Sequence, residues 1–218
     1  MDSKKIIGKY KKSASEKLRG TATSLALIYN IKKFHSATDE LASARLKNRS
    51  LPSFECAKGC AYCCSLRVEI LPPEAFRIAR YIKGIEPEAR DDLQKRIEAG
   101  AQYAEGKTFK EYSRPCPFLS ESGTCEIYSE RPHKCRKYFS VKVSACRENN
   151  SALEDRELVD AENDLVRAFI ELYKKKKVVM HPAELSNAVL LALNDPSLEE
   201  RWGKGEQVFD LLPEKIEL

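Results

Sequence analysis

No stretch of this sequence is apolar for long enough to cross a membrane. The most apolar run, Leu25 to Ile31, is much shorter than the roughly 20 residues that a membrane-spanning helix needs. No apolar segment follows the polar residues 1–5, so we expect no secretory signal. These absences predict a cytoplasmic protein with no membrane partner.

The sequence also has little glycine, little proline and little excess charge. Nine Gly and ten Pro among 218 residues exclude a collagen-like or low-complexity chain. The 38 basic and 33 acidic residues leave a net charge of +5, which is too small to indicate a nucleic-acid partner without a clustered basic patch. The one basic run, Lys174 to Lys177, closes a helix-like segment, where it complements the helix dipole. We therefore expect no nucleic-acid partner.

The sequence patterns of common enzyme sites are missing as well. We find no Gly-rich turn between a strand and a helix, of the kind that holds a nucleotide-like cofactor. Asp and Glu are numerous, but none stands with a His or Ser in a catalytic arrangement that we can identify. Whether the protein is an enzyme stays open, and no catalytic residue is predicted.

Helical patterns begin and end the chain. Residues 1–14 are rich in lysine, and we expect them to be frayed. From about Ser15 to Leu46, apolar residues recur mostly at steps of three and four, which predicts a helix with one buried face. After residue 150 the pattern is helical again, and the final helix contains Trp202.

The middle of the chain mixes short elements. Residues 65–70 alternate apolar and polar side chains, as in a short half-buried strand. Two helices are expected from about Pro72 to Gly84 and from about Pro87 to Ala104, forming an inserted antiparallel pair. A Gly-containing loop between residues 115–119 and 125–128 predicts a hairpin.

These patterns predict a mainly α fold with a small, irregular α+β centre rich in cysteine. We expect three parts: an N-terminal helical segment (1–50), a metal-binding domain containing the helical pair (51–150) and a C-terminal helical segment (151–218) that packs on the same body. The chain is long enough to bury a substantial core.

Cysteine is what the middle part has in abundance. All eight cysteines lie in two blocks, and we expect all of them to bind metal: Cys56, Cys60, Cys63, Cys64, Cys116, Cys125, Cys135 and Cys146. Scattered cysteines would indicate core packing, whereas this confinement indicates a shared site. In a reducing compartment, grouped thiols indicate metal binding before disulfides.

The spacing leaves the number of metals open. Cys60 and Cys63, two residues apart, form a usual chelating pair, and Cys56 adds a thiol from about one helical turn away. Cys64 directly follows Cys63, and neighbouring side chains diverge, which suggests two metals, a bridging thiolate or a polynuclear cluster. Thiolate-only ligand sets suit both zinc and iron–sulfur clusters.

Several neighbours of the cysteines have expected roles. Tyr62 and Tyr138 are expected to pack over the centre and limit water access. His133 follows an Arg-Pro turn and is expected to be a turn residue rather than a ligand, and His35 a surface or packing residue. Basic residues near the thiols could offset their negative charge: Lys58, Arg67, Arg131, Lys134, Arg136 and Lys137.

The combined cysteine pattern resembles the YkgJ-type cysteine-cluster family, abbreviated CxxCxxCC. The pattern comprises Cys-x₃-Cys-x₂-Cys-Cys, then Cys116-Pro-Phe-Leu, Gly-x-Cys125-x-Ile-Tyr, Arg131-Pro-x-x-Cys135-Arg and Cys146. This family is described as chelating zinc or iron, which implies that all eight cysteines belong to the metal site. The family shorthand has two residues between its first two cysteines, where this chain has three.

Two enzyme resemblances give alternatives. Flagellin lysine N-methylases carry a similar cysteine block in longer chains, which would imply an iron–sulfur enzyme in electron transfer or protein modification. Cys56-x₃-Cys60-x-Tyr62-Cys63 also resembles the motif of radical S-adenosylmethionine enzymes. That motif normally lies on a βα barrel, and it would leave five cysteines unexplained. We therefore prefer a metal-binding protein that holds zinc, iron or an iron–sulfur cluster.

Overall fold

The computed structural model describes residues 2–20, 22–48, 50–57, 59–149 and 151–212. Among these residues the fold is mainly helical with one small two-stranded sheet, which confirms the predicted fold class. The helices are α1 (Ser3–Lys17), α2 (Ser24–Leu46), α3 (Pro72–Lys83), α4 (Pro87–Ala104), α5 (His133–Lys137), α6 (Val143–Asn149), α7 (Arg156–Lys174), α8 (Leu185–Asn194) and α9 (Leu198–Gly203). Two 3₁₀ helices, η1 (Tyr62–Ser65) and η2 (Tyr128–Glu130), and two strands, β1 (Glu69–Ile70) and β2 (Ala183–Glu184), complete the described elements.

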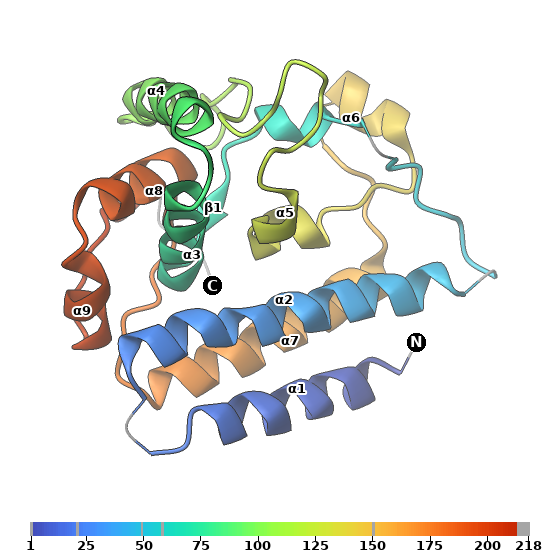
Figure 1. Ribbon diagram of the computed structural model, residues 1–218. Coiled ribbons are helices and arrows are strands. Elements are labelled where there is room, and N and C mark those ends of the chain that lie inside the picture. Colours follow the sequence, from blue (N-terminus) through green and yellow to red (C-terminus); the bar gives the residue numbers. More distant parts are fainter. Residues whose placement is uncertain (1, 21, 49, 58, 150, 213–218) are drawn as a thin grey trace.

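Three long helices, α1, α2 and α7, form a layer at the bottom of Figure 1. Aromatic side chains fill the contact between α2 and α7: the rings of Phe34 and Phe169 stack with centroids 4.3 Å apart. The hydroxyl of Tyr173 donates a 2.6 Å hydrogen bond to the carbonyl of Leu27, which joins the two helices at one end. The helix predicted from about Ser15 to Leu46 therefore begins only at Ser24, as α2, and it packs on α7.

The first residues of the chain are helical, so the predicted frayed start is wrong. Ile6, Tyr10 and Ala14 are buried at steps of four along α1, and Leu18 continues the row. Lysines fill most of the outer face, which obscured this short apolar row in the sequence. The Asp2 side chain caps the helix by accepting a 3.1 Å hydrogen bond from the Lys5 N–H.

The second layer consists of α3, α4 and α8, with α9 beside them (Figure 1). The two helices predicted in the middle of the chain form as α3 and α4. Each packs extensively on α8 and not on the other, so the predicted antiparallel pair is wrong. Gly100 on α4 allows this close approach, because a β-carbon there would lie 2.8 Å from the Ser186 hydroxyl on α8. The strands β1 and β2 pair antiparallel, with Ile70 opposite Ala183.

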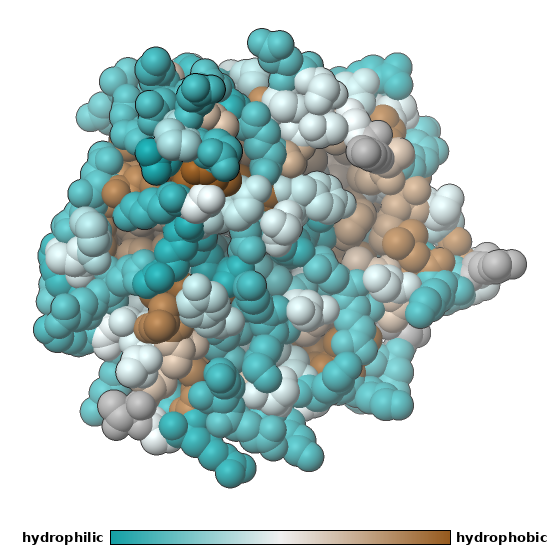
Figure 2. Space-filling model, in the orientation of Figure 1, coloured by the Kyte–Doolittle hydropathy of each residue, from teal (hydrophilic) through white to brown (hydrophobic). Residues whose placement is uncertain are grey.

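One hydrophobic core joins the layers, and the cysteine-bearing loops lie above it. Buried residues from α1 through the segment after α9 belong to a single cluster. Figure 2 shows that hydrophilic residues cover most of the visible face, with hydrophobic residues gathered in smaller areas. No helix in the described part of the chain is both long and apolar enough to span a bilayer.

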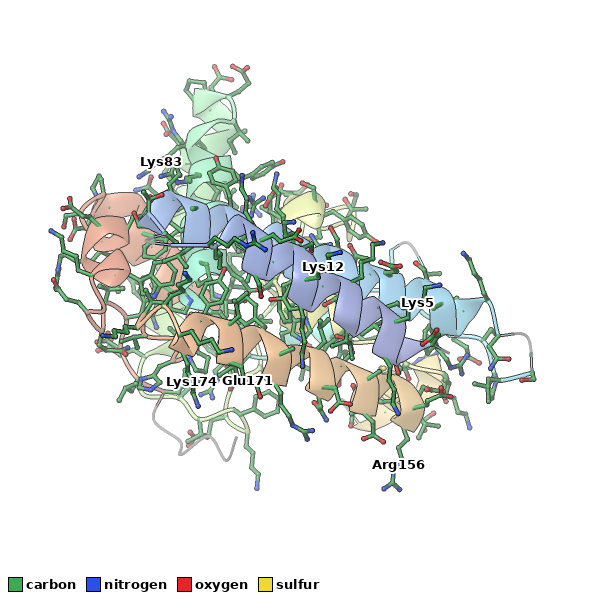
Figure 3. All side chains as sticks on the ribbon, turned by 90° about the horizontal axis from the view of Figure 1, so that it is seen from below. Lys5, Lys12, Lys83, Arg156, Glu171 and Lys174 are labelled. Atoms are coloured by element: carbon green, nitrogen blue, oxygen red, sulfur yellow. The ribbon has the colours of Figure 1, made fainter. Side chains whose placement is uncertain are left out.

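Charged side chains cover the outer face of the long-helix layer. Figure 3 views this face from below, and five labelled residues lie on its two outer helices: Lys5, Lys12, Arg156, Glu171 and Lys174. All five are exposed. The cysteine loops lie on the opposite side of α2 from these charged side chains (Figure 1).

Candidate metal centre

The first cysteine block lies on a loop that ends in η1. The chain leaves α2 and returns to the centre of the molecule along this loop (Figure 1). Gly59 has φ of +89°, a conformation that favours glycine, and the Cys60 N–H bonds to the Ala57 carbonyl at 3.0 Å. The Cys64 N–H donates a 2.9 Å hydrogen bond to the Ala61 carbonyl. These local bonds hold Cys63 and Cys64 side by side in one tight turn.

The next two cysteines lie on the predicted hairpin, which is present. Leu119 and Cys125 form an antiparallel bridge, and the Glu126 N–H bonds to the Phe118 carbonyl at 2.8 Å. The Cys116 N–H donates a 2.7 Å hydrogen bond to the carbonyl of Cys64. This backbone contact joins the later cysteine block to the earlier one.

Helix α5 carries Cys135, and a buried carboxylate holds that helix in place. The Glu74 Oε1 atom on α3 accepts a 2.6 Å hydrogen bond from the His133 N–H at the start of α5. The same atom lies 2.8 Å from His35 Nε2 on α2, and Oε2 accepts a bond from the Leu71 N–H. Glu74 therefore ties three elements together next to Cys135. Sequence reasoning missed Glu74 because a first-turn acid in a helix is ordinarily exposed.

The last cysteine, Cys146, lies on α6, and the first cysteine is tethered beside that helix. The Ser140 N–H lies 3.3 Å from Cys56 Sγ, and the Glu55 N–H bonds to the Ser140 carbonyl at 3.0 Å. The Glu55 carboxylate accepts a 2.7 Å hydrogen bond from the N–H of Val143, the first residue of α6. The segment that carries Cys56, the first cysteine, therefore contacts the start of the helix that carries Cys146, the last one.

All eight cysteines are free thiols; Cys146 is buried and the other seven are partly buried. Burial raises the pKa of Cys116 to about 12, and the thiols of Cys125 and Cys63 contribute to the rise. Burial also raises the pKa of Cys135 well above its usual range, with contributions from Cys116, Cys63 and Cys125. Thiols from both blocks therefore lie close enough to influence one another.

Cys63 has a second set of thiol neighbours. Burial raises the pKa of Cys56, although the Ser140 N–H lowers it. The thiols that raise it further are those of Cys60, Cys63 and Cys146. The pKa of Cys63 itself is raised, first by its hydrogen bond with the Cys64 thiol and then by burial.

The thiols are near one another without forming a finished coordination sphere. Within the described residues, no three His, Cys, Asp or Glu side chains are placed so that they could hold one metal ion. The donor chemistry nevertheless fits a thiophilic cation, because clustered, partly buried thiols with raised pKa values lose their protons when a metal coordinates the sulfur. Ligation would require these side chains to draw together.

Of the basic residues expected to offset thiolate charge, Arg131 faces the cysteines. Burial raises the pKa of Cys125 and Cys135. The guanidinium of Arg131 lowers both pKa values, but by less than burial raises them. Arg67 instead bonds to the Lys107 carbonyl and Glu69, and Arg136 to Asp39. Lys58 lies outside the described residues.

His133 and Glu162 form a buried pair. The imidazole Nδ1 lies 3.0 Å from the Thr38 hydroxyl, and Nε2 lies 3.9 Å from a Glu162 oxygen. His35 is buried and bonded to Glu74, as expected for a packing histidine. Sequence reasoning did not identify Glu162, whose position on α7 carried no motif.

Tyr138 lies beside the thiols, whereas Tyr62 is partly open to solvent. Both tyrosines line a narrow crevice, too small for a water molecule, together with Cys63 and Cys146. Tyr62 is 41% exposed, so it covers the thiols only in part. A larger cavity of about 470 Å³ lies between α4 and α8, and no cysteine is among its described lining residues. The thiols therefore lie in the loop region and not at this larger cavity.

Comparison with protein families identifies one match. The family described as "CxxCxxCC: Putative zinc- or iron-chelating domain" matches residues 55–164, half of the chain. The chain belongs to this family. The CxxCxxCC match contains all eight cysteines, with the hairpin, α5 and α6. Neither the curated proteins nor the solved structures contain a significant match to this CxxCxxCC protein.

Proposed function

We propose that the protein binds zinc or iron through its eight cysteines. The observation that carries the proposal is the meeting of the two cysteine blocks, where Cys116 of the later block bonds to the Cys64 carbonyl of the earlier one. The thiol of Cys63 in the first block contributes to the raised pKa values of Cys116 and Cys135 in the second, in addition to burial. Membership of the CxxCxxCC family supports the same chemistry.

A bound cation would stabilise this region electrostatically. Thiolates brought together without a cation repel one another and lose hydration, whereas a metal compensates their charge. Structural zinc sites contribute on the order of 10–16 kcal/mol of apparent binding free energy in zinc-finger peptides. Arg131 supplies additional positive charge beside two of the thiols.

We extend the proposal to domain organisation and location. Residues 51–150 would form the metal-binding domain, with residues 1–50 and 151–218 packing on the same body. The single hydrophobic core, which includes residues of all three parts, supports their packing on one body. Free thiols at all eight positions support a reducing compartment, the cytoplasm.

Anaerobic purification followed by metal analysis and a visible spectrum tests the function. We expect zinc or iron in stoichiometric amount. A colourless, zinc-containing protein would support a redox-inert centre, whereas a brown protein bleached by dithionite would support an iron–sulfur cluster. Protein prepared in this way that contains neither metal would contradict the proposal.

A further inference from the structure

The basic residues of this chain are distributed unevenly. Residues 2–20 and 174–177 contain 11 of the 38 basic residues but only two of the 33 acidic residues. The rest of the chain therefore has 27 basic and 31 acidic residues, so the net charge of +5 conceals a strongly basic part and a slightly acidic remainder. The seven basic residues from Lys4 to Arg19, together with Lys174 to Lys177, are called the basic face below.

The fold brings these two stretches of sequence together. Helices α1 and α7 pack side by side in the long-helix layer and end at the same edge of the molecule (Figure 1). At that edge the Lys176 Nζ atom donates a 2.8 Å hydrogen bond to the carbonyl of Gly20, just beyond the end of α1. The lysines that close α7 therefore lie beside the basic residues that close α1.

The side chains of the basic face are open to solvent. All of them are exposed except Lys176, which is half-buried. Lys4 and Lys5 recur two helical turns later as Lys11 and Lys12, so these four side chains share the side of α1 that faces away from its buried row. The positive charge therefore extends along the whole length of α1.

Helix stability does not account for this charge. Cations stabilise the last turn of a helix, which explains Lys174 to Lys177, but they are unfavourable in the first turn, where Lys4 and Lys5 lie. Among the described ion pairs, only the exposed pair of Lys9 with Glu40 neutralises a residue of the basic face. The face is therefore largely uncompensated and available to a polyanion.

Two observations distinguish between the polyanions that such a face could bind. A helix that binds a bilayer inserts an apolar side into it, whereas Ile6, Ala14 and Leu18 are buried in the protein core. Single-stranded nucleic acid stacks on exposed aromatic rings, whereas Tyr10, the one aromatic residue within 2–20 and 174–177, is 3% exposed. A duplex requires neither feature, because Lys and Arg bind its phosphates directly.

We propose that the basic face binds the phosphate backbone of a nucleic-acid duplex without reading its sequence. The 15 residues of α1 span about 22 Å, and a DNA duplex of that length carries roughly 13 phosphate charges. The small net charge predicted no nucleic-acid partner unless the basic residues were clustered, and the fold clusters them. This inference goes beyond metal binding and involves no cysteine.

Fluorescence anisotropy tests the proposal, with the full-length, metal-loaded protein titrated into a short labelled DNA duplex. We expect binding that weakens roughly 100-fold between about 50 and 200 mM salt, as about four phosphate contacts require, and that is equal for two unrelated sequences. No binding at the lower salt concentration would overturn the proposal. Binding to phosphatidylserine-containing vesicles but not to the duplex would also overturn it. Metal content is measured on the same samples, so failure of metal binding is recognised separately.

Glutamine variants locate the binding surface. The combined variant Lys4→Gln, Lys5→Gln, Lys11→Gln and Lys12→Gln should weaken duplex binding at least about tenfold and make it less dependent on salt, because phosphate contacts are lost. These side chains are exposed, so the far-ultraviolet circular dichroism and the bound metal should stay unchanged.

A matched control removes the same amount of charge elsewhere. Its four exposed lysines lie outside the basic face, and each is replaced by glutamine: Lys83, Lys95, Lys110 and Lys204. We expect this control to weaken duplex binding by less than about threefold, since it removes no phosphate contact. Equal weakening by the two combined variants would show that only the net charge matters, which would contradict a binding site on the basic face.

Discussion

At the scale of single residues, Arg131 is the side chain best placed to tune the thiols. Its guanidinium lies over the Tyr128 ring, 3.7 Å from the ring centre, and it acts on thiols of both cysteine blocks, including Cys63. Stacking on an aromatic ring restrains a guanidinium without neutralising it. Arg131 therefore supplies a fixed positive charge where thiolates would form.

We predict that Arg131→Gln weakens zinc affinity about tenfold, which corresponds to ~1.4 kcal/mol. The charge that stabilises the thiolates is lost, whereas Arg131→Lys should retain much of it. Competition with a chromogenic chelator measures the affinity. Arg147→Gln, which removes an exposed charge on α6, is the control. Equal weakening by both glutamine variants would show that general surface charge is responsible.

Glu162 is a second residue with a testable electrostatic role. It is 1% exposed, and neither of its carboxylate oxygens has a hydrogen-bond partner among the described residues. Burial raises the pKa of Glu162 to about 8, although the charge of Lys137 lowers it. Between the unfolded pKa near 4.5 and about pH 8, the folded protein retains a proton that the unfolded chain releases. Folding stability therefore falls as the pH rises through this window.

We predict that Glu162→Gln stabilises the protein at pH 9 by roughly 2–4 kcal/mol, because the neutral amide avoids the cost of ionising a buried group. At pH 5 the difference should nearly vanish. Urea unfolding at both pH values measures it. The exposed α7 residue Asp160 gives the control Asp160→Asn, which should leave stability unchanged at both pH values. A stabilisation by Glu162→Gln that is independent of pH would contradict the raised pKa.

At the scale of elements, the site depends on how α5 is held. Glu74 accepts hydrogen bonds from the backbone of α5 and of its own helix start, and it pairs with His35 on α2. Its side chain is 2% exposed, so these bonds are shielded from water. Cys135 lies two residues beyond the anchored His133.

We predict that Glu74→Ala destabilises the protein by roughly 3–5 kcal/mol, since it leaves buried partners unpaired. Chemical denaturation with bound metal measures the loss. Glu40→Ala on α2 is the control, because Glu40 pairs with Lys9 at the surface and should contribute less than about 1 kcal/mol. If the two variants lose similar stability, Glu74 does not anchor α5.

Local patterns predicted the long helices well. The four-residue rows of α2 and α7, and the Pro-initiated starts of α3 and α4, are visible in the sequence because each helix buries one face. Residues 1–14 were misjudged because lysines separate Ile6, Tyr10 and Ala14, which are buried by packing on both α2 and the distant α7. Local sequence does not reveal such long-range packing.

The site was predictable in composition but not in arrangement. Cysteine spacing identified the thiols, and the Gly-containing loop identified the hairpin. The role of Glu74 depends on three elements that are distant in sequence, so no local motif could indicate it. The contact between the two cysteine blocks, in which the Cys116 N–H bonds to the Cys64 carbonyl, likewise depends on the fold.

At the scale of the whole molecule, the long-helix layer and the cysteine loops have different sources of stability. Helices α1, α2 and α7 bury their own apolar contacts, whereas the loop from 50 to 65 has few regular elements. We predict that metal removal increases hydrogen exchange in residues 54–65 and 115–149, and leaves α2 and α7 protected. Mass spectrometry of the exchanged peptides measures this. Uniform loss of protection would mean that the metal is required for the entire fold.

The most direct test of the central claim is thiol alkylation of the metal-loaded protein under anaerobic conditions, followed by peptide mass spectrometry. The claim is that cysteines far apart in the chain hold metal together. We predict slow alkylation of cysteines in both blocks, including Cys63 and Cys135, and rapid alkylation of both after chelation. Rapid alkylation of either whole block while metal remains bound would contradict the claim.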